Sequence, residues 1–469
     1  MATELAFRSL TELGGGLRRK EFSSRELVDH YLARIDRANK KLHAYVEVYA
    51  ESARAAAEAA DKQRLAGMPI GPLHGLPIAV KDLCDIEGRI GTVGSKAWAS
   101  RRGTTTATVV ERLLSAGMII LGKTHMVEFA FGGWGTNPLM GTPWNPWDLA
   151  THRVPGGSSS GSGVAVAAGL APAAIGSDTG GSVRIPAAFN GITGLKTTFG
   201  WISLHGCFPL STTLDSIGPL TRTTEDSARV FAALAGFDAK DPITHHLPVL
   251  ELPAFDAPKV KGLRIAMLPE SQFPSGVDAA VRTAWREAGE VFRKLGAIVE
   301  ERRVPFDIDE LAARNGRLIA SEGYAIHRDY IEDEKVAIGQ FVRARMMAGR
   351  GVSAADYIAV REHQRKTAAQ FTAWMEDADA LLAPACPVPA IPVANVDEKT
   401  TPATLTRSGN YIGACGLSLP AGFSPDGLPV GIQLLGRPFN EHVLLRMGAA
   451  YEQATDWHRR TPKLDALMG

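Results

Sequence analysis

Two glycine- and serine-rich segments constrain this chain more than any other feature of its sequence. The first covers residues 155–163 (PGGSSSGSG) and the second covers residues 176–184 (GSDTGGSVR), with the small apolar stretch 164–170 between them. Because glycine and serine carry little or no side chain, backbone N–H groups can converge in such segments. That geometry suits an anion, either a permanent phosphate or an oxyanion that exists only in a transition state.

Three other interpretations compete with a catalytic anion site. A flexible Gly/Ser linker is common, but this composition occurs twice and lies between apolar stretches. A phosphate-binding loop needs GxxxxGK[ST] or GxGxxG after a strand, and no lysine follows the glycines here. Residues 157–161 match the GxSxG of α/β-hydrolases formally, but that motif needs a buried strand before it, and residues 151–155 (THRVP) do not form one.

The rest of the chain has the pattern of an α/β protein. Glu26 follows Ser23 by three residues, which predicts a capping box at a helix start. Nothing marks a linker, so we expect one domain over residues 1–469, organised as N-terminal helices (1–66), a catalytic core (67–230) and a helical region (about 275–375). Short apolar runs between glycines predict buried strands, namely residues 78–80, 118–121, 173–175, 263–268, 298–299, 381–382, 417–419 and 431–434.

Composition excludes several classes of function. Fifty-one Lys and Arg balance fifty Asp and Glu, which gives no bulk attraction to nucleic acid or an anionic membrane. No apolar run is long enough to span a bilayer, and the first twenty residues do not resemble a secretory signal. The four cysteines lie far apart without a CxxC pair, which indicates reduced residues in a cytoplasmic protein and no zinc site.

A serine nucleophile needs a base, and the sequence offers Lys81 as one candidate. A serine hydroxyl attacks at neutral pH only with a base beside it, and no histidine lies near Ser182 in the sequence. Lys81 ends the apolar run 78–80, so its stem is expected to be buried. A lysine there is often a surface residue with a buried stem, but burial can also hold it neutral and make it a base.

Together the three segments resemble the amidase signature family. That family has a lysine after G-(L/I)-P-(I/L)-x-V, then GGSS with a Gly/Ser tail, then GSDTGGS-(I/V)-R, and this chain has all three in order. The resemblance covers nearly the whole chain. Further matches lie at Lys123–Ala130, Asn145–Trp147, Gly194–Thr197, Asp215–Pro219, Asn410–Gly422 and Gly427–Gln433.

The resemblance implies a catalytic role for each matching residue. Ser182 aligns with the acylated nucleophile, Ser158 with a bridging serine after a cis peptide bond, and Lys81 with the base. It implies an oxyanion hole of backbone N–H groups at Thr179, Gly180 and Gly181, joined by that of Ser182, and structural roles for Asp178 and Arg184. The implied fold is a single large α/β domain whose central twisted mixed sheet is covered by helices on both faces.

Substrate-binding residues follow less directly from the resemblance. By family position, Ala130, Phe131 and Gly132 border the acyl pocket, and Trp134 is expected in its wall. One of three arginines in the helical region is a candidate for binding a substrate carboxylate, namely Arg343, Arg345 or Arg361.

The favoured function is hydrolysis of a carboxylic amide or ureide through an acyl-enzyme, releasing ammonia or an amine without a metal or organic cofactor. We expect a small-molecule amide substrate, no nucleic acid or membrane partner, and a monomer or homodimer in the cytoplasm. The alternative is the A subunit of a glutamyl/aspartyl-tRNA amidotransferase, which releases ammonia from glutamine; those subunits carry an aspartate where this chain has Ala403 or Thr404. An α/β-hydrolase-like esterase is a weaker alternative.

Overall fold

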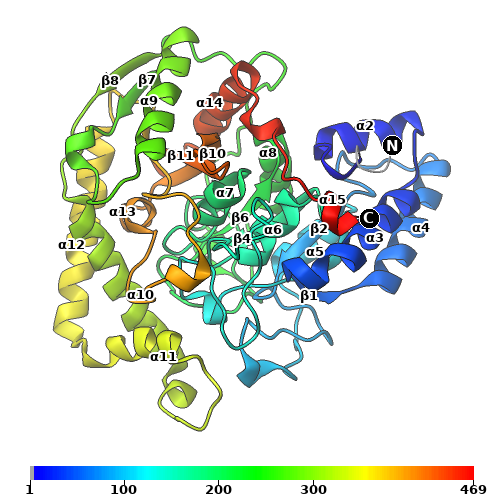
Figure 1. The fold of residues 1–469 in the computed structure, drawn as a ribbon, viewed down its shortest axis with the longest axis horizontal. Coiled ribbons are helices and arrows are strands. Elements are labelled where there is room, and N and C mark those ends of the chain that lie inside the picture. The colour runs from blue at the N-terminus through cyan, green and yellow to red at the C-terminus, as the bar shows by residue number, and fades with distance from the viewer. Residues whose placement is uncertain (1–4, 469) are drawn as a thin grey trace.

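An eleven-stranded mixed β-sheet runs through the centre of the molecule (Figure 1). The computed structural model describes residues 5–468. Strands β2, β3 and β4 pair in parallel, as do β7, β8 and β9, and the remaining pairs are antiparallel. In spatial order the strands are β1 (Tyr45–Val48), β3 (Ile119–Thr124), β2 (Pro77–Lys81), β4 (Ala173–Ser177), β6 (Ile217–Thr221), β5 (Thr193–Lys196), β10 (Cys415–Phe423), β11 (Pro429–Gly436), β9 (Ala380–Pro384), β7 (Arg264–Met267) and β8 (Ile298–Glu301).

Helices cover both faces of this sheet, which confirms the predicted fold class. Every residue of β2, β4 and β11 is buried. Because successive strand residues point to opposite faces, such strands need cover on both sides. The covering helices include α5 (Thr108–Ser115), α6 (Ser160–Ala167), α7 (Arg184–Asn190), α8 (Thr224–Leu234), α9 (Ala279–Lys294) and α14 (Glu441–Ala454).

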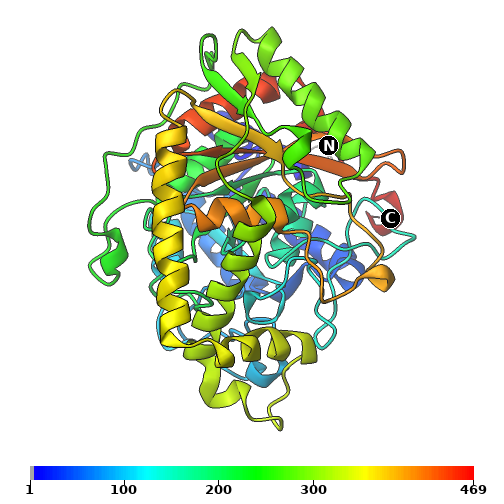
Figure 2. The same cartoon turned by 90° about the vertical axis from the view of Figure 1, so that its left-hand side faces the viewer.

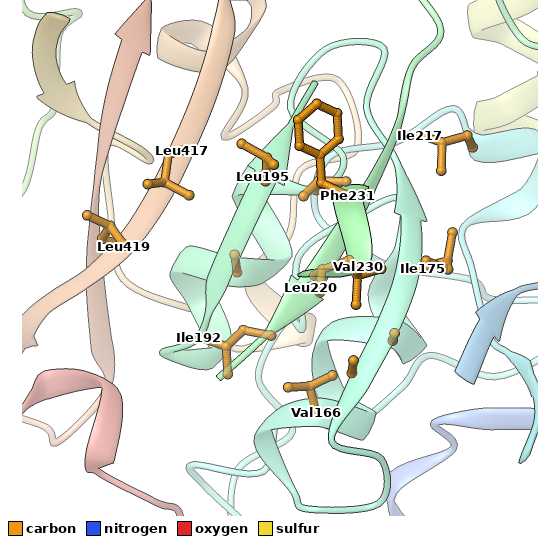
Figure 3. Close-up of a cluster of buried hydrophobic side chains, with 14 of the residues drawn as sticks. Val166, Ile175, Ile192, Leu195, Ile217, Leu220, Val230, Phe231, Leu417 and Leu419 are labelled. Atoms are coloured by element: carbon orange, nitrogen blue, oxygen red, sulfur yellow. The ribbon is translucent and has the colours of Figure 1, made fainter. Parts of the chain in front are cut away.

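The apolar core lies between these helices and the middle of the sheet. Figure 3 shows side chains from β4, β5, β6, β10, α6 and α8 gathered there, all of them buried. Burying a large apolar side chain contributes about 1.5–3 kcal/mol, so this cluster anchors the strands that lead into the Gly/Ser-rich loops. Its labelled members are Val166, Ile175, Ile192, Leu195, Ile217, Leu220, Val230, Phe231, Leu417 and Leu419.

Three N-terminal helices flank one end of the sheet: α2 (Leu10–Arg19), α3 (Ser24–Leu42) and α4 (Ala50–Leu65). The predicted capping box is present, because the Ser23 side chain accepts from the Glu26 N–H and the Glu26 carboxylate accepts from the Ser23 N–H. The C-terminal helix α15 (Asp465–Met468) lies beside α3 (Figure 1). None of the helices within residues 5–468 combines the length and apolar character needed to cross a bilayer.

A helical layer stands at the other end of the molecule. It contains α10 (Ile308–Ile331), α11 (Gln340–Met347) and α12 (Ala354–Trp374), and Figure 2 shows the long α12 upright beside α10. Helix α13 (Thr404–Tyr411) packs against α10. This packing brings the C-terminal part of the chain next to the loop that follows β4.

Candidate active site

Lys81 lies at the end of β2 and is fully buried among three serine hydroxyls. Its Nζ lies 2.8 Å from Ser158 Oγ, 3.0 Å from Ser159 Oγ and 2.8 Å from Ser177 Oγ. Burial lowers the pKa of Lys81 from 10.5 to about 7, although Cys84, Asp215 and Asp178 oppose that shift. A lysine with such a pKa is half neutral near pH 7 and can accept a proton.

Ser158 follows a cis peptide bond from Gly157 and is itself fully buried. The loop before it needs glycine, because a Cβ on Gly157 would lie 2.7 Å from the carbonyl oxygen of Gly132. Gly156 has φ of +75° and would place a Cβ 2.9 Å from Pro186 Cα. The glycines therefore let this loop pack against its neighbours closely enough to bring Ser158 to Lys81.

Ser182 stands in the loop between β4 and α7, with 8% of its surface exposed. Its backbone carbonyl accepts from the Ser159 N–H at 3.3 Å, which joins the two Gly/Ser loops. Across residues 5–468, no hydrogen bond links the Ser182 hydroxyl to the Ser158 hydroxyl. Catalytic hydrogen bonds are often long in a protein without substrate and tighten when it binds.

Backbone amides around Ser182 are free to receive an anion. The Gly181 N–H already donates to Asp178 Oδ1 at 2.8 Å. In the described part of the chain, the N–H groups of Thr179, Gly180 and Ser182 make no hydrogen bond. Of the predicted oxyanion donors, Thr179 and Gly180 are therefore available together with Ser182, whereas Gly181 shapes the loop.

A buried ion pair holds this loop in place. Asp178 and Arg184 are both fully buried and lie 3.1 Å apart. Burial alone would raise the pKa of Asp178, but the Arg184 guanidinium outweighs it and lowers that pKa to about 2. Arg184 also donates to Gln433 Oε1 at 2.8 Å and to Asn410 Oδ1 at 2.6 Å. The C-terminal motif thus supports the loop, as the sequence predicted for Asp178 and Arg184.

Sequence reasoning missed two of the three hydroxyls around Lys81 and one carboxyl group. Ser159 and Ser177 both contact the lysine, and Ser177 could have been found because it directly precedes Asp178 at the end of a predicted strand. Asp215 accepts from Thr179 Oγ1 at 2.6 Å, and burial raises its pKa to about 6. Ser160 has a buried hydroxyl without a partner in the described part of the chain.

Two small cavities lie near the Gly/Ser-rich loops. One of about 180 Å³ is lined by Ala130, Ser177 and Thr179 among others. The second, of about 230 Å³, is lined by Phe131 and Gly132.

Trp134, expected in the wall of the acyl pocket, is buried in an apolar cluster. Its ring stacks on Phe189 with centroids 6.4 Å apart, and its Nε1 donates to the Thr400 carbonyl at 3.2 Å. The loop carrying Trp134 nevertheless touches the catalytic loop, because the Gly156 N–H donates to the Trp134 carbonyl.

The three arginines considered from the sequence are engaged with other groups. Arg343 donates to the carbonyls of Ile331 and Val336. Arg345 pairs with Glu398 at 2.6 Å. The third, Arg361, donates to Gln364.

All four cysteines are free thiols, and Cys84 and Cys207 lie 3.7 Å apart between their sulfur atoms. Within residues 5–468, no group of three or more His, Cys, Asp or Glu side chains is placed to hold a metal ion.

Known proteins with similar sequences match this chain along almost its whole length. The family model described as Amidase matches residues 26–445. The glutamyl-tRNA(Gln) amidotransferase A subunit of Chloroflexus aggregans is 37% identical over 98% of this chain and 99% of its own length. The protein of the same name from Ralstonia nicotianae is 39% identical over 97% and 99%.

A similar solved structure comes from a vestigial protein complex that reveals the origins of an s-triazine catabolic enzyme. It is 32% identical, covers 95% of this chain and 98% of its own, and superposes with a TM-score of 0.88.

These comparisons correct one expectation. The sequence suggested a small-molecule amide as the sole partner, with no nucleic acid and at most a homodimer. That expectation is wrong. The relatives that match almost the whole chain are named as one subunit of an amidotransferase, and their name also includes a tRNA. With the Amidase model matched over residues 26–445, and with relatives up to 39% identical along the chain, this protein belongs to the amidase signature family.

Proposed function

We propose that this chain is the amide-hydrolysing component of an amidotransferase built from several subunits, in which it releases ammonia from glutamine. The observation that carries the proposal is the near full-length identity of 37–39% to the A subunits of such enzymes, in a chain that has Lys81, Ser158 and Ser182. The contacts of Lys81 with Ser158 and two other serines support the chemistry.

The proposed cycle is acyl transfer through Ser182. Neutral Lys81 accepts a proton from Ser158, which accepts one from Ser182 as the Ser182 oxygen attacks the amide carbonyl. The free N–H groups of Thr179 and Gly180 donate to the tetrahedral oxyanion. The relay then returns the proton to the leaving nitrogen, the C–N bond breaks, and water releases the acyl group.

The proposed enzyme also contains partner subunits. The net charge of +1 gives the chain little general attraction for RNA, so the partner subunits are expected to provide most of the tRNA binding. The cytoplasm, where aminoacyl-tRNA is used, is the proposed location.

A second candidate is hydrolysis of a different small amide that bears a carboxylate. The specific observation is that Ala403 and Thr404 are both uncharged, and one of them stands where glutamine-using subunits are expected to carry an aspartate. Without an acidic partner, the ammonium group of glutamine is costly to bury.

Ammonia release tests both candidates. The full chain is assayed with glutamine and with a panel of simple amides, alone and with its partner subunits, and Ser182→Ala is the blank. Glutamine-dependent ammonia release that rises when partners are added supports the proposal. Rapid hydrolysis of another amide, with glutamine inert even in the complex, replaces it with the second candidate.

A further inference from the structure

Arg407 and Asn315 present polar groups without partners beside the catalytic loop. Arg407 lies on α13 and Asn315 on α10. Asn315 is fully buried, yet in the described part of the chain neither its Oδ1 nor its Nδ2 has a hydrogen-bond partner. Within residues 5–468, the Arg407 guanidinium makes no hydrogen bond and no ion pair.

Both side chains lie against Gly180, two residues before Ser182. A Cβ on Gly180 would lie 3.2 Å from Arg407 Cγ and 3.3 Å from Asn315 Oδ1. A Cβ on Gly316 would lie 3.2 Å from Arg407 Nη1. The guanidinium therefore sits between α10 and the loop that carries the nucleophile and the free N–H groups.

Arg407 borders the 230 Å³ cavity, which has an excess of positive charge, and Asn315 lies next to the lining residue Gly316. Arg407 and Gly316 line the cavity together with Arg345, Lys399 and Glu398. Glu398 is already paired with Arg345 at 2.6 Å. Burial and the charge of Arg345 lower the pKa of Arg407 to about 10, so Arg407 remains a cation at neutral pH.

An anion at the edge of this cavity, beside Gly180, would satisfy both side chains. Arg407 is partly buried, and a cation shielded from water without a counter-ion is costly. Each unpaired polar atom of the buried Asn315 amide adds to that cost. A guanidinium binds a carboxylate through two parallel N–H···O bonds, which are among the strongest hydrogen bonds in proteins. The Asn315 amide can donate a third bond from Nδ2.

We propose that Arg407 and Asn315 form a carboxylate-binding subsite, so that the amide cleaved at Ser182 carries a carboxylate a few bonds from its scissile carbonyl. The inference rests on the proposed function, because it places the bound group in the same substrate. The substrates are then mono-amides of short dicarboxylic acids. Glutamine belongs to this class and carries an additional ammonium group.

Direct binding tests this subsite without turnover. The full chain carrying Ser182→Ala is titrated by calorimetry with glutaramate, which is glutamine without its ammonium group, and with pentanamide, which also lacks the carboxylate. We expect glutaramate to bind about 10- to 100-fold more tightly than pentanamide, as a charged bidentate contact provides. Adding Arg407→Gln should remove that preference and leave pentanamide binding unchanged.

Two further variants make the outcome decisive. Arg350→Gln removes an exposed arginine that pairs with Glu332, and it should keep the preference for glutaramate. Asn315→Asp keeps the shape of the side chain but places a negative charge beside Arg407, so glutaramate binding should fall at least tenfold. If Arg407→Gln does not fold, Asn315→Asp still tests the subsite.

The results separate this inference from the proposed function. Equal binding of glutaramate and pentanamide, or an undiminished preference in both Arg407→Gln and Asn315→Asp, overturns the subsite even if glutamine is hydrolysed. The protein could instead bind glutaramate in an Arg407-dependent way and yet hydrolyse no amide with its partners present. That result supports the subsite and refutes the proposed function. Tighter binding of glutamine than of glutaramate, still dependent on Arg407, supports the subsite and identifies the ammonium as a second recognised group.

Discussion

Replacing Lys81 with methionine should make the protein inactive and, at neutral pH, more stable. Holding the pKa of a buried lysine at about 7 instead of 10.5 costs about 5 kcal/mol of folding free energy, at about 1.4 kcal/mol per tenfold change in the proton equilibrium. Methionine removes that cost. It also removes the contacts to three serine hydroxyls, worth about 1 kcal/mol each, so a net gain of about 2 kcal/mol is expected at pH 7.

The pH dependence of this difference is the sharper result. Between pH 7 and pH 10.5 the unfolded lysine holds a proton that the folded Lys81 does not, so the stability of the unsubstituted protein rises with pH. The advantage of Lys81→Met is therefore largest below pH 7. It should shrink by about 1.4 kcal/mol per pH unit above pH 7.

Equilibrium urea unfolding at several pH values from 6 to 9.5 measures this slope. Lys196→Met is a matched control, because burial also lowers the pKa of Lys196, but only to about 8. Its stability difference should stay flat up to about pH 8 before it falls. If the difference for Lys81→Met does not change with pH, Lys81 is not held neutral and cannot be the base.

Three further changes probe the surroundings of the site. Asp178→Asn leaves the buried Arg184 charge unpaired and should cost about 3–5 kcal/mol in urea unfolding; a loss under 1 kcal/mol would contradict the anchoring role. Ser160→Ala removes a buried hydroxyl that has no partner within residues 5–468 and should raise the unfolding free energy by up to about 1 kcal/mol, whereas a loss would reveal a missing partner. The His74 ring lies against the Ala60 carbonyl, with Nε2 at 3.1 Å, so His74→Gln should keep the acid limb of the pH–rate profile; losing that limb would make the histidine the base.

Much of the sheet could be predicted from local pattern. The apolar runs at β2, β3 and β4 have the length and composition of buried strands, and all three formed where expected. Strand β6 was not predicted because it contains Gly218 and Pro219, which are unfavourable in strands. In the structure, a Cβ on Gly218 would lie 1.9 Å from the carbonyl oxygen of Leu195 on β5, so close strand packing outweighs local propensity there.

Strand β1 was missed for a different reason. Tyr45–Val48 lies between two helical stretches, and it forms a strand only because the edge of β3 is available to pair with it. Four residues carry too little periodicity to reveal such a pairing.

The site was predictable where motifs are local and unpredictable where the fold brings distant segments together. Lys81 ends an apolar strand, so its burial follows from sequence, but its contact with Ser177 depends on the parallel pairing of β2 and β4. Arg407 and Asn315 lie in helices that carry no motif, and only the packing of α13 on α10 places them at the catalytic loop. Likewise, the burial of Trp134 against Phe189 depends on tertiary packing between segments far apart in the sequence.

Trapping the acyl-enzyme tests the central claim most directly. The complex is acid-quenched during turnover and digested with trypsin, and the peptide spanning residues 154–184 is fragmented, because it contains both Ser158 and Ser182. We predict an added acyl mass on Ser182 that is absent from Ser182→Ala. An acyl mass on Ser158 or Ser159, or an unchanged adduct in Ser182→Ala, would contradict the assignment of Ser182 as the nucleophile.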